Sequence, residues 1–384
     1  MGELAARAEV VKLAHELGAD ANALTFLRRT DDVRLAALRH SISGALFAIH
    51  EPRLRRIAGL SKLLPPALSA KIAENALGPM LCGRIAGVLD LGAAVRLAGH
   101  LPPAFLAEVS RFIDPERTAE IVRALPEDLV LRVARVLLDT DEYIVLGRFV
   151  AVVDERVAAH VIEMASGAQL LQSSCYAEDR TRIDALLAHA SDDRLADALR
   201  AAHEADLFDE AVSLLAFIGV DGQERLSRVL VSVDDPAVAD GVVRAVVGLG
   251  AWTELLPVVG RLSTEAIRLL VNVPTTRDAA VISDLIQQVL GVEDAREGLL
   301  EQARDLGYFP LLVDVIDALD DEHRAVLADV PELDEPQWRA YGAALLDVDV
   351  ETVAAAVESF RTGGPIPAEL VDALGRSGAA GGAA

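Results

Sequence analysis

The sequence predicts an all-α protein arranged as an α-solenoid, a superhelix of short helical hairpins similar to HEAT and armadillo proteins. Its 384 residues are 52% hydrophobic but only 4% aromatic, and a composition rich in Ala, Leu and Val favours closely packed helices. Apolar residues in the segment 77–148 repeat in three rows of 24. Proline and aspartate signals for helix starts recur along the same segment.

The three rows begin at Leu77, Leu101 and Leu125. Later columns follow the spacing i, i+4, i+7 and i+8, which places them on one side of a short helix. These columns are Leu81, Phe105 and Leu129; Ile85, Val109 and Val133; and Val88-Leu89, Phe112-Ile113 and Val136-Leu137. Such short helices are marginal alone in water, so each unit must bury its apolar side against the next unit.

The helix starts have a chemical cause. In Asp114-Pro115-Glu116 the aspartate can accept from free backbone N–H groups, proline needs no acceptor, and glutamate suits the positive helix end. Asp235-Pro236 repeats the device, while Pro103 and Pro126 also stand where a helix should begin. Each row of 24 therefore predicts two helices of about 9 to 11 residues.

The repeats suggest a division of the chain. Residues 1–166 are predicted to form an N-terminal superhelix with units of about 24 residues, and residues 180–375 a more irregular, acidic helical region. The weakly patterned segment 167–179 is the predicted junction. The tail 376–384 is rich in Gly and Ala, and we expect it to be disordered.

The net charge of −24 is unevenly distributed. Residues 1–150 hold 19 Lys and Arg against 18 Asp and Glu, whereas residues 151–384 hold 17 against 42. An acidic surface repels nucleic acid, so we expect no nucleic-acid binding over most of the chain. No apolar run approaches the roughly 18 residues of a membrane span, and neither a secretion signal nor an acylation signal is visible.

Two cysteines, Cys82 and Cys175, lie far apart without C-x-x-C spacing. This pattern indicates neither a disulfide framework nor a zinc site, and it favours a cytoplasmic location.

A basic cluster near the N-terminus is the candidate partner-binding site. Its arginines can bind carboxylates or phosphates, so the partner could be an acidic protein, a phosphate-bearing ligand or the chain's own acidic half. The alternative is a solvated surface with salt bridges between helices. The cluster comprises Arg28, Arg29, Arg34, Arg39, Arg53, Arg55, Arg56 and Lys62.

Carboxylate clusters occur between predicted helices, where capping is the favoured role and divalent-cation binding the alternative. They are Asp31-Asp32, Asp192-Asp193, Asp234-Asp235 and Asp320-Asp321-Glu322. Asp192, Asp193 and Asp197 together are similar to the aspartate-rich helix of prenyl-diphosphate enzymes, but few aromatic residues are available for such a pocket. Because no H-E-x-x-H, P-loop, G-x-S-x-G or dinucleotide-binding motif occurs in a suitable context, we predict no catalytic residue and no cofactor.

The helix starts Leu101-Pro102-Pro103 and Asp114-Pro115-Glu116-Arg117 resemble those of the cytosolic N domain of MgtE-type magnesium channels. The likeness covers roughly residues 60–165. It implies a short-helix superhelix acting as a regulatory or docking module, and it makes Mg²⁺ a candidate ligand. The family's regulatory and membrane domains do not follow in this sequence, so no metal ligand is transferred.

The sequence thus predicts a non-enzymatic cytoplasmic scaffold that binds a protein partner, with self-association into a homo-oligomer as one version. A Mg²⁺-responsive regulator and an all-helical lyase or transferase are the alternatives.

Overall fold

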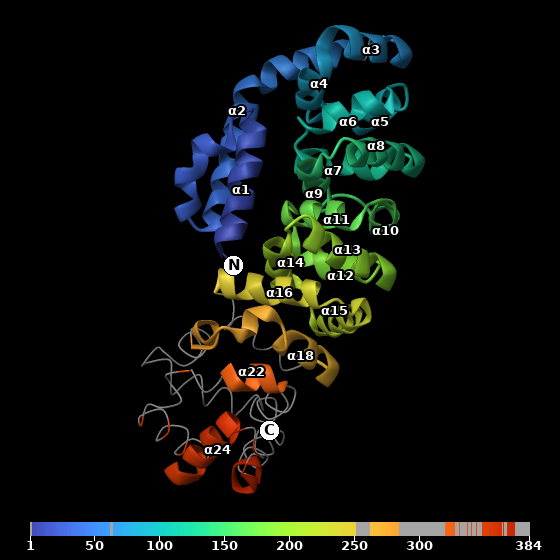
Figure 1. Cartoon of the computed structure of the whole chain (residues 1–384). Coiled ribbons are helices and arrows are strands. Elements are labelled where there is room, and N and C mark those ends of the chain that lie inside the picture. Colours follow the sequence, from blue (N-terminus) through green and yellow to red (C-terminus); the bar gives the residue numbers. More distant parts are fainter. Residues whose placement is uncertain are drawn as a thin grey trace. The chain divides into compact units, whose positions relative to one another are not determined.

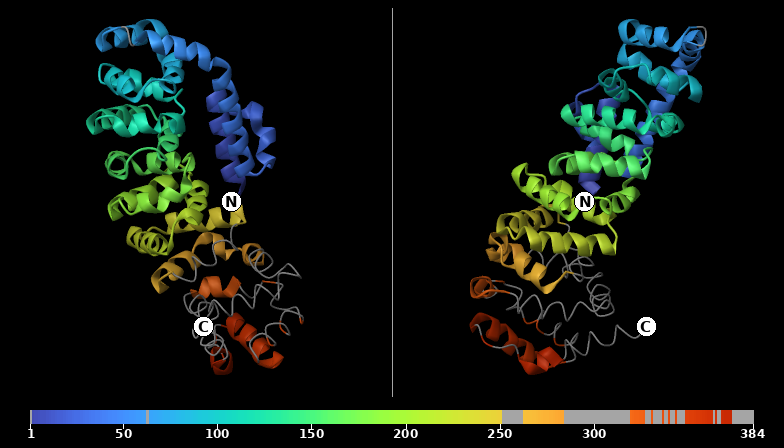
Figure 2. Two further views of the ribbon diagram at one scale, coloured as in Figure 1. Left: turned by 180° about the vertical axis from the view of Figure 1, so that it is seen from behind. Right: turned by 90° about the vertical axis from the view of Figure 1, so that its right-hand side faces the viewer.

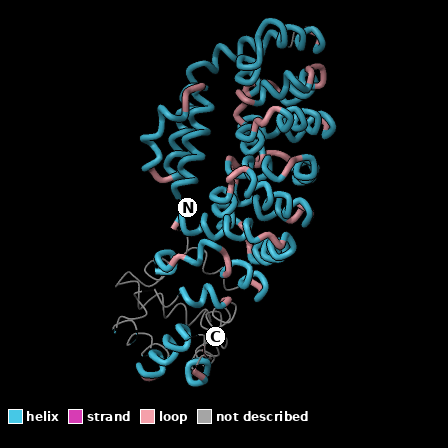
Figure 3. Tube along the Cα trace, in the orientation of Figure 1, coloured by secondary structure: helices cyan, strands magenta, loops and turns pink. Residues whose placement is uncertain are grey.

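The computed structural model describes residues 2–61, 64–250, 262–283 and parts of 319–372 (Figure 1). Every regular element in these residues is a helix and none is a strand (Figure 3), which confirms the all-α prediction. The chain divides into two units, Met1–Ile218 and Gly219–Ala384. Lys62 and residues 376–384 lie outside the described residues.

The first unit opens with a hairpin of two helices, α1 (Gly2–Leu17) and α2 (Asp32–Ser61), joined by the 3-10 helix η1 (Ala21–Arg29). Helix α1 is followed by Gly18 at φ 63°, a left-handed conformation that glycine adopts without strain. The Asp20 side chain then caps η1 by accepting from the Asn22 N–H. With 30 residues, α2 is about three times as long as the helices that the repeat predicts.

Short helices make up the rest of the first unit. They are α3 (Pro66–Ile72), the π-helix η2 (Ala73–Leu77), α4 (Gly78–Ala86), α5 (Leu91–Ala98), α6 (Pro103–Ser110), α7 (Pro115–Ala124), α8 (Glu127–Asp139), α9 (Tyr143–Phe149), α10 (Glu155–Met164), α11 (Gly167–Cys175), η3 (Arg180–Arg182), α12 (Ile183–Leu187), α13 (Asp192–Glu204), α14 (Phe208–Leu214) and η4 (Leu215–Phe217). The predicted starts are confirmed: Pro103 is the first residue of α6, Pro126 precedes α8, and Asp114 accepts from the Arg117 N–H at 3.3 Å.

Many of these short helices pack against the second helix along the chain, so that the helices form successive layers (Figure 2). Helix α4 contacts α6, α6 contacts α8, α8 contacts α10, and α10 contacts α12; likewise α5 contacts α3 and α7. Residues of the apolar columns form the core between these helices. Leu101, Phe105 and Val109 belong to one buried cluster, and Leu137 belongs to another. Phe112 differs and is 40% exposed, because α6 ends at Ser110 and leaves it in the following turn.

Two glycines allow helices to touch through their backbones. A Cβ on Gly147 of α9 would overlap the carbonyl oxygen of Ser173, and a Cβ on Gly167 of α11 would lie 2.5 Å from the backbone of Asp197 in α13. Helix α9 is therefore in contact with α11 at Gly147, and α11 with α13 at Gly167. The predicted junction 167–179 lies within this packed region, inside the first unit.

The second unit contains α15 (Val220–Val233), α16 (Pro236–Leu249), α18 (Thr264–Val271), the 3-10 helix η5 (Pro274–Arg277), α22 (Asp321–Val326) and α24 (Val350–Thr362). Asp235 caps α16 as predicted, accepting from the Ala237 N–H at 2.9 Å. Ala239, Val243 and Val273 form its main described cluster. Across the described residues of both units, no helix has the length and apolarity needed to cross a bilayer.

Candidate protein-binding site

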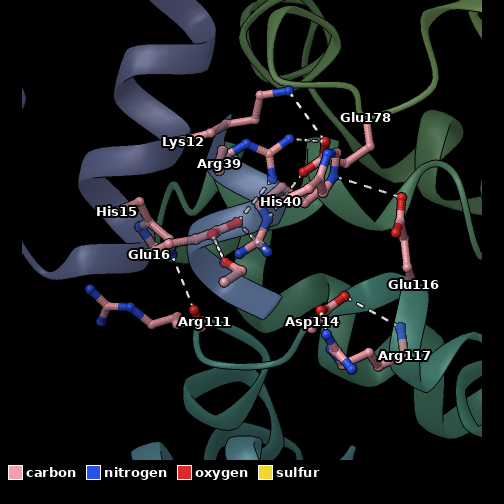
Figure 4. A network of polar contacts seen from close by, with 12 residues as sticks. Lys12, His15, Glu16, Arg39, His40, Arg111, Asp114, Glu116, Arg117 and Glu178 are labelled. Carbon is pink, nitrogen blue, oxygen red and sulfur yellow. Dashed lines mark hydrogen bonds and ion pairs between the residues drawn. The ribbon is translucent and has the colours of Figure 1, made fainter. Parts of the chain in front are cut away.

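A buried ionic network fixes the N-terminal hairpin to the short helices (Figure 4). At its centre is Arg39 of α2, which is 2% exposed. Its guanidinium donates to Glu9 at 3.0 Å and Glu16 at 2.9 Å, both on α1, and to Glu178 at 2.5 Å, which follows α11. One arginine thus joins three segments that are distant in sequence.

Two further cations complete the network. Arg148 of α9 pairs with Glu16 at 2.9 Å and with Glu178 at 3.3 Å. Lys12, which is 1% exposed, pairs with Glu9 and lies 3.4 Å from Glu178. Three cations therefore face three carboxylates, which is the balance that buried charges need to offset their loss of hydration.

The network keeps its central groups ionised. Burial acts to lower the pKa of Arg39, but the carboxylates of Glu178, Glu9 and Glu16 outweigh burial and raise it. Burial likewise acts to raise the pKa of Glu178, but Lys12 and Arg39 outweigh it and lower that pKa below its ordinary value. Arg39 and Glu178 are accordingly charged at neutral pH.

The lowered pKa of Glu178 predicts acid sensitivity. Its stabilising contribution is complete above the unfolded carboxyl pKa of about 4.3 and is lost as pH falls through the lower folded pKa, because the unfolded chain then binds the extra proton. We expect urea midpoints to fall between about pH 5 and pH 3, and Glu178→Gln to be less stable at pH 7 with a flatter acid response. Parallel acid profiles for the two proteins would contradict this assignment.

Helix α2 leaves an apolar stripe uncovered on its outer side. Leu38 is 42% exposed, Leu46 44% and Ile49 69%. The other side of the helix is buried, since Leu54 packs with Ile85 and the ring of Phe47 lies 4.3 Å below the Arg117 guanidinium. Ten of the fifteen large apolar residues exposed in the described part of the chain lie between residues 17 and 80.

Three exposed arginines flank the stripe. Arg34 precedes it, Arg53 and Arg56 follow it, and none of the three forms an ion pair with another described residue. At 100° per residue, Arg34, Leu38, Leu46 and Ile49 fall within an arc of about 120°. Arg53 and Arg56 follow Pro52, which lies inside the helix. We call this surface the α2 face: Arg34, Leu38, Leu46, Ile49, Arg53 and Arg56.

No acidic side chain of α2 neutralises the α2 face. The acidic residues of the helix point elsewhere: Glu51 pairs with Arg55 at 2.6 Å, and Asp32 lies 3.9 Å from Arg180. The face is therefore both apolar and positively charged.

The structure divides the predicted basic cluster. Arg29, Arg34, Arg53, Arg55 and Arg56 are exposed. Arg28 is half-buried, with an Nε that has no hydrogen-bond partner. Arg39 is a correction to the predicted contact set, because it lies inside the protein and binds three of the chain's own carboxylates.

Sequence reasoning missed the network partners Glu9, Lys12, Glu16, Arg148 and Glu178. One signal was present: Glu9, Lys12 and Glu16 follow helical spacing on one side of α1, beside the buried Val10 and Leu13. Charges at core positions of a helix indicate an internal partner.

The carboxylate clusters mostly act within the fold. Asp31 accepts from the Arg34 N–H at 3.2 Å, and Asp320 accepts from the His323 N–H at 2.8 Å. Asp197 pairs with Arg200 at 3.3 Å. Among the described residues, no group of three His, Cys, Asp or Glu side chains is arranged to hold a metal ion.

Both cysteines are free thiols. Burial raises the pKa of Cys82 to about 11 and that of Cys175 to about 12, so both stay protonated at neutral pH and are weak nucleophiles.

The distinctive surface of the described chain is the α2 face, on the same helix that the buried ionic network anchors through Arg39. No protein-family model, curated protein or solved structure matches this chain.

Proposed function

We propose that the protein is a non-enzymatic α-solenoid scaffold that binds a protein partner on the α2 face. This proposal rests on the exposed stripe of Leu38, Leu46 and Ile49, which has arginines without an ion-pair partner among the described residues at both ends. The alternating contacts between short helices support the solenoid arrangement, since each unit of a repeat stack packs on its neighbours. Contiguous exposed apolar surface with a polar rim is typical of interaction sites.

The chemistry of the face selects the partner. An amphipathic helix can bury its apolar side on Leu38, Leu46 and Ile49 in the helix-docking mode that many partners use. Glu or Asp residues near the ends of that helix would pair with Arg34 at one end and with Arg53 and Arg56 at the other. Positions 34 to 56 span about 33 Å of helix. The partner is therefore an acidic amphipathic helix of roughly 20 residues.

A second copy of the chain is the other candidate partner, because an acidic, helical surface is present in the protein itself. Residues 219–384 contain 12 Lys and Arg against 29 Asp and Glu. An α2 face binding this region of another copy would produce head-to-tail assembly. Sedimentation of the pure protein at several concentrations distinguishes the two cases, since a monomer at all concentrations excludes self-association.

The test is quantitative affinity capture from the protein's own cells with matched variants. In Leu46→Glu/Ile49→Glu, the new carboxylates oppose both apolar burial and the acidic partner, so the captured partner should fall at least tenfold, as for a central hot spot. Leu91→Glu is the control, because Leu91 is 43% exposed but lies on α5. Equal recovery of the same partners by both variants would exclude the α2 face. Binding should also weaken as salt is raised, because charge pairs at the rim are screened.

A further inference from the structure

A pocket of about 420 Å³ in the first unit is separate from the α2 face. It is bounded by α1, α9, α11 and α14 and by Asp32 at the start of α2, but none of the six α2-face residues lines it. One wall is apolar, with Val11 on α1 and Leu207, Leu214 and Phe217 around α14. The size is in the range of small-molecule sites, which combine apolar walls with a few polar groups.

Two opposite charges face the pocket without an ion-pair partner among the described residues. They are Arg7 of α1 and Glu210 of α14. Both lie close enough to the Cys175 thiol to act on its pKa: burial has the largest effect, Glu210 raises the pKa, and Arg180 and Arg7 lower it. Burial also has the largest effect on the pKa of Tyr176 and raises it, while Arg7 lowers that pKa and Glu210 raises it. The free positive and negative charges therefore border the same part of the pocket.

The other charged lining residues are already engaged. Arg180 lies 3.9 Å from Asp32, and its guanidinium stands 5.2 Å from the centre of the Phe217 ring. This arrangement leaves Arg7 and Glu210 for a ligand.

An acceptor in the pocket also lacks a donor. The side-chain oxygen of Gln172 on α11 is buried and has no hydrogen-bond partner. Buried amide oxygens are nearly always paired, because an unpaired one loses hydration without compensation. A ligand that supplies an N–H group would satisfy it once the Gln172 amide rotates toward the pocket.

We propose that this pocket binds a free α-amino acid with a large apolar side chain. The ligand carboxylate would pair with Arg7, its ammonium group would donate to Glu210 and to the Gln172 oxygen, and its side chain would contact the wall of Leu207, Leu214 and Phe217. Glu210 would repel a phosphate or a dicarboxylate, and Arg7 would repel a polyamine. A neutral apolar ligand would bury both charges without partners, which is unfavourable.

The first experiment uses the full-length protein and measures its melting temperature and binding heat with L-phenylalanine, L-leucine and L-tryptophan, each at about 10 mM, since a ligand bound only by the folded state raises Tm. Glycine, N-acetyl-L-phenylalanine and L-phenylalaninamide are the controls, because they lack the apolar side chain, the ammonium group and the carboxylate, respectively. We expect at least one of the three apolar amino acids to raise Tm and the controls to have little effect. The proposal is overturned if none of the three raises Tm, or if the two capped analogues act as strongly as L-phenylalanine.

Variants then test the assigned contacts for the amino acid that binds. Arg7→Gln and Glu210→Gln should each weaken its binding about ten- to a hundredfold, the usual consequence of losing a charge-assisted hydrogen bond. Arg29→Gln is the matched control, because Arg29 is exposed and does not line the pocket. Unchanged affinity in both pocket variants would overturn the assignment. Partner capture by Leu46→Glu/Ile49→Glu is a separate readout, so failure of one proposal leaves the other standing.

Discussion

Replacing Arg39 with methionine is expected to lower the free energy of unfolding of the first unit by about 3–5 kcal/mol. The substitution preserves much of the side-chain volume but leaves the buried carboxylates of Glu9, Glu16 and Glu178 with two cations instead of three. Breaking a buried ion network in this way costs more than losing one exposed contact, because the remaining charges stay away from water. Urea unfolding followed by circular dichroism measures the loss.

The matched control for Arg39→Met is Arg55→Met on the same helix. Arg55 is 68% exposed and pairs with Glu51, so its loss should change stability by about 0.5 kcal/mol or less. Hydrogen exchange should also increase in peptides from α1 and α2 in the Arg39 variant, since the network anchors both helices. Similar stability changes in the two variants would show that the network contributes little.

Gly167→Ala is expected to destabilise the first unit by about 3 kcal/mol. The added methyl group would lie 2.5 Å from backbone atoms of Asp197 and Ala198, so α11 and α13 must separate. A backbone neighbour cannot rotate away as a flexible side chain can. Gly147→Ala should act in the same direction, because its methyl group meets the carbonyl oxygen of Ser173. Thermal and urea unfolding measure both changes.

Gly59→Ala provides the control for the glycine substitutions. Gly59 lies within α2, and outside the adjacent residues and backbone of that helix no atom lies within 4 Å of the position that its Cβ would take. Alanine is the better helix former, so this change should stabilise the protein by about 0.5–1 kcal/mol. If all three substitutions stabilised the protein, helix propensity would matter more at these positions than helix contact.

Local features of the fold were predictable from the sequence. The first leucine of each row, Leu77, Leu101 or Leu125, lies within two residues of the start of α4, α6 or α8, respectively. Asp114 and Asp235 cap helices as their spacing indicates. These features depend on neighbours within a few residues, which is the range that periodicity and capping signals report.

Long-range features were not predictable in the same way. Arg39 lies among other arginines in the sequence, and no local pattern shows that it meets Glu178, 139 residues further on. The weakly patterned segment 167–179 is the predicted junction. In the structure Gly167 brings α11 close to α13, and Ser166 and Gln169 form a capping box, for which the sequence carries the S-x-x-Q signal.

The reach of the network also matters during synthesis. Arg39 leaves the ribosome long before Glu178, which is 139 residues away, and at ordinary elongation rates the delay is on the order of 10 seconds. Throughout that interval the nascent hairpin holds cations and carboxylates whose final partner does not yet exist. Residues of the α1–α2 hairpin are consequently among the last to reach their native setting, and a stalled or truncated chain ending before residue 178 would present this hairpin unanchored, with its apolar surface exposed.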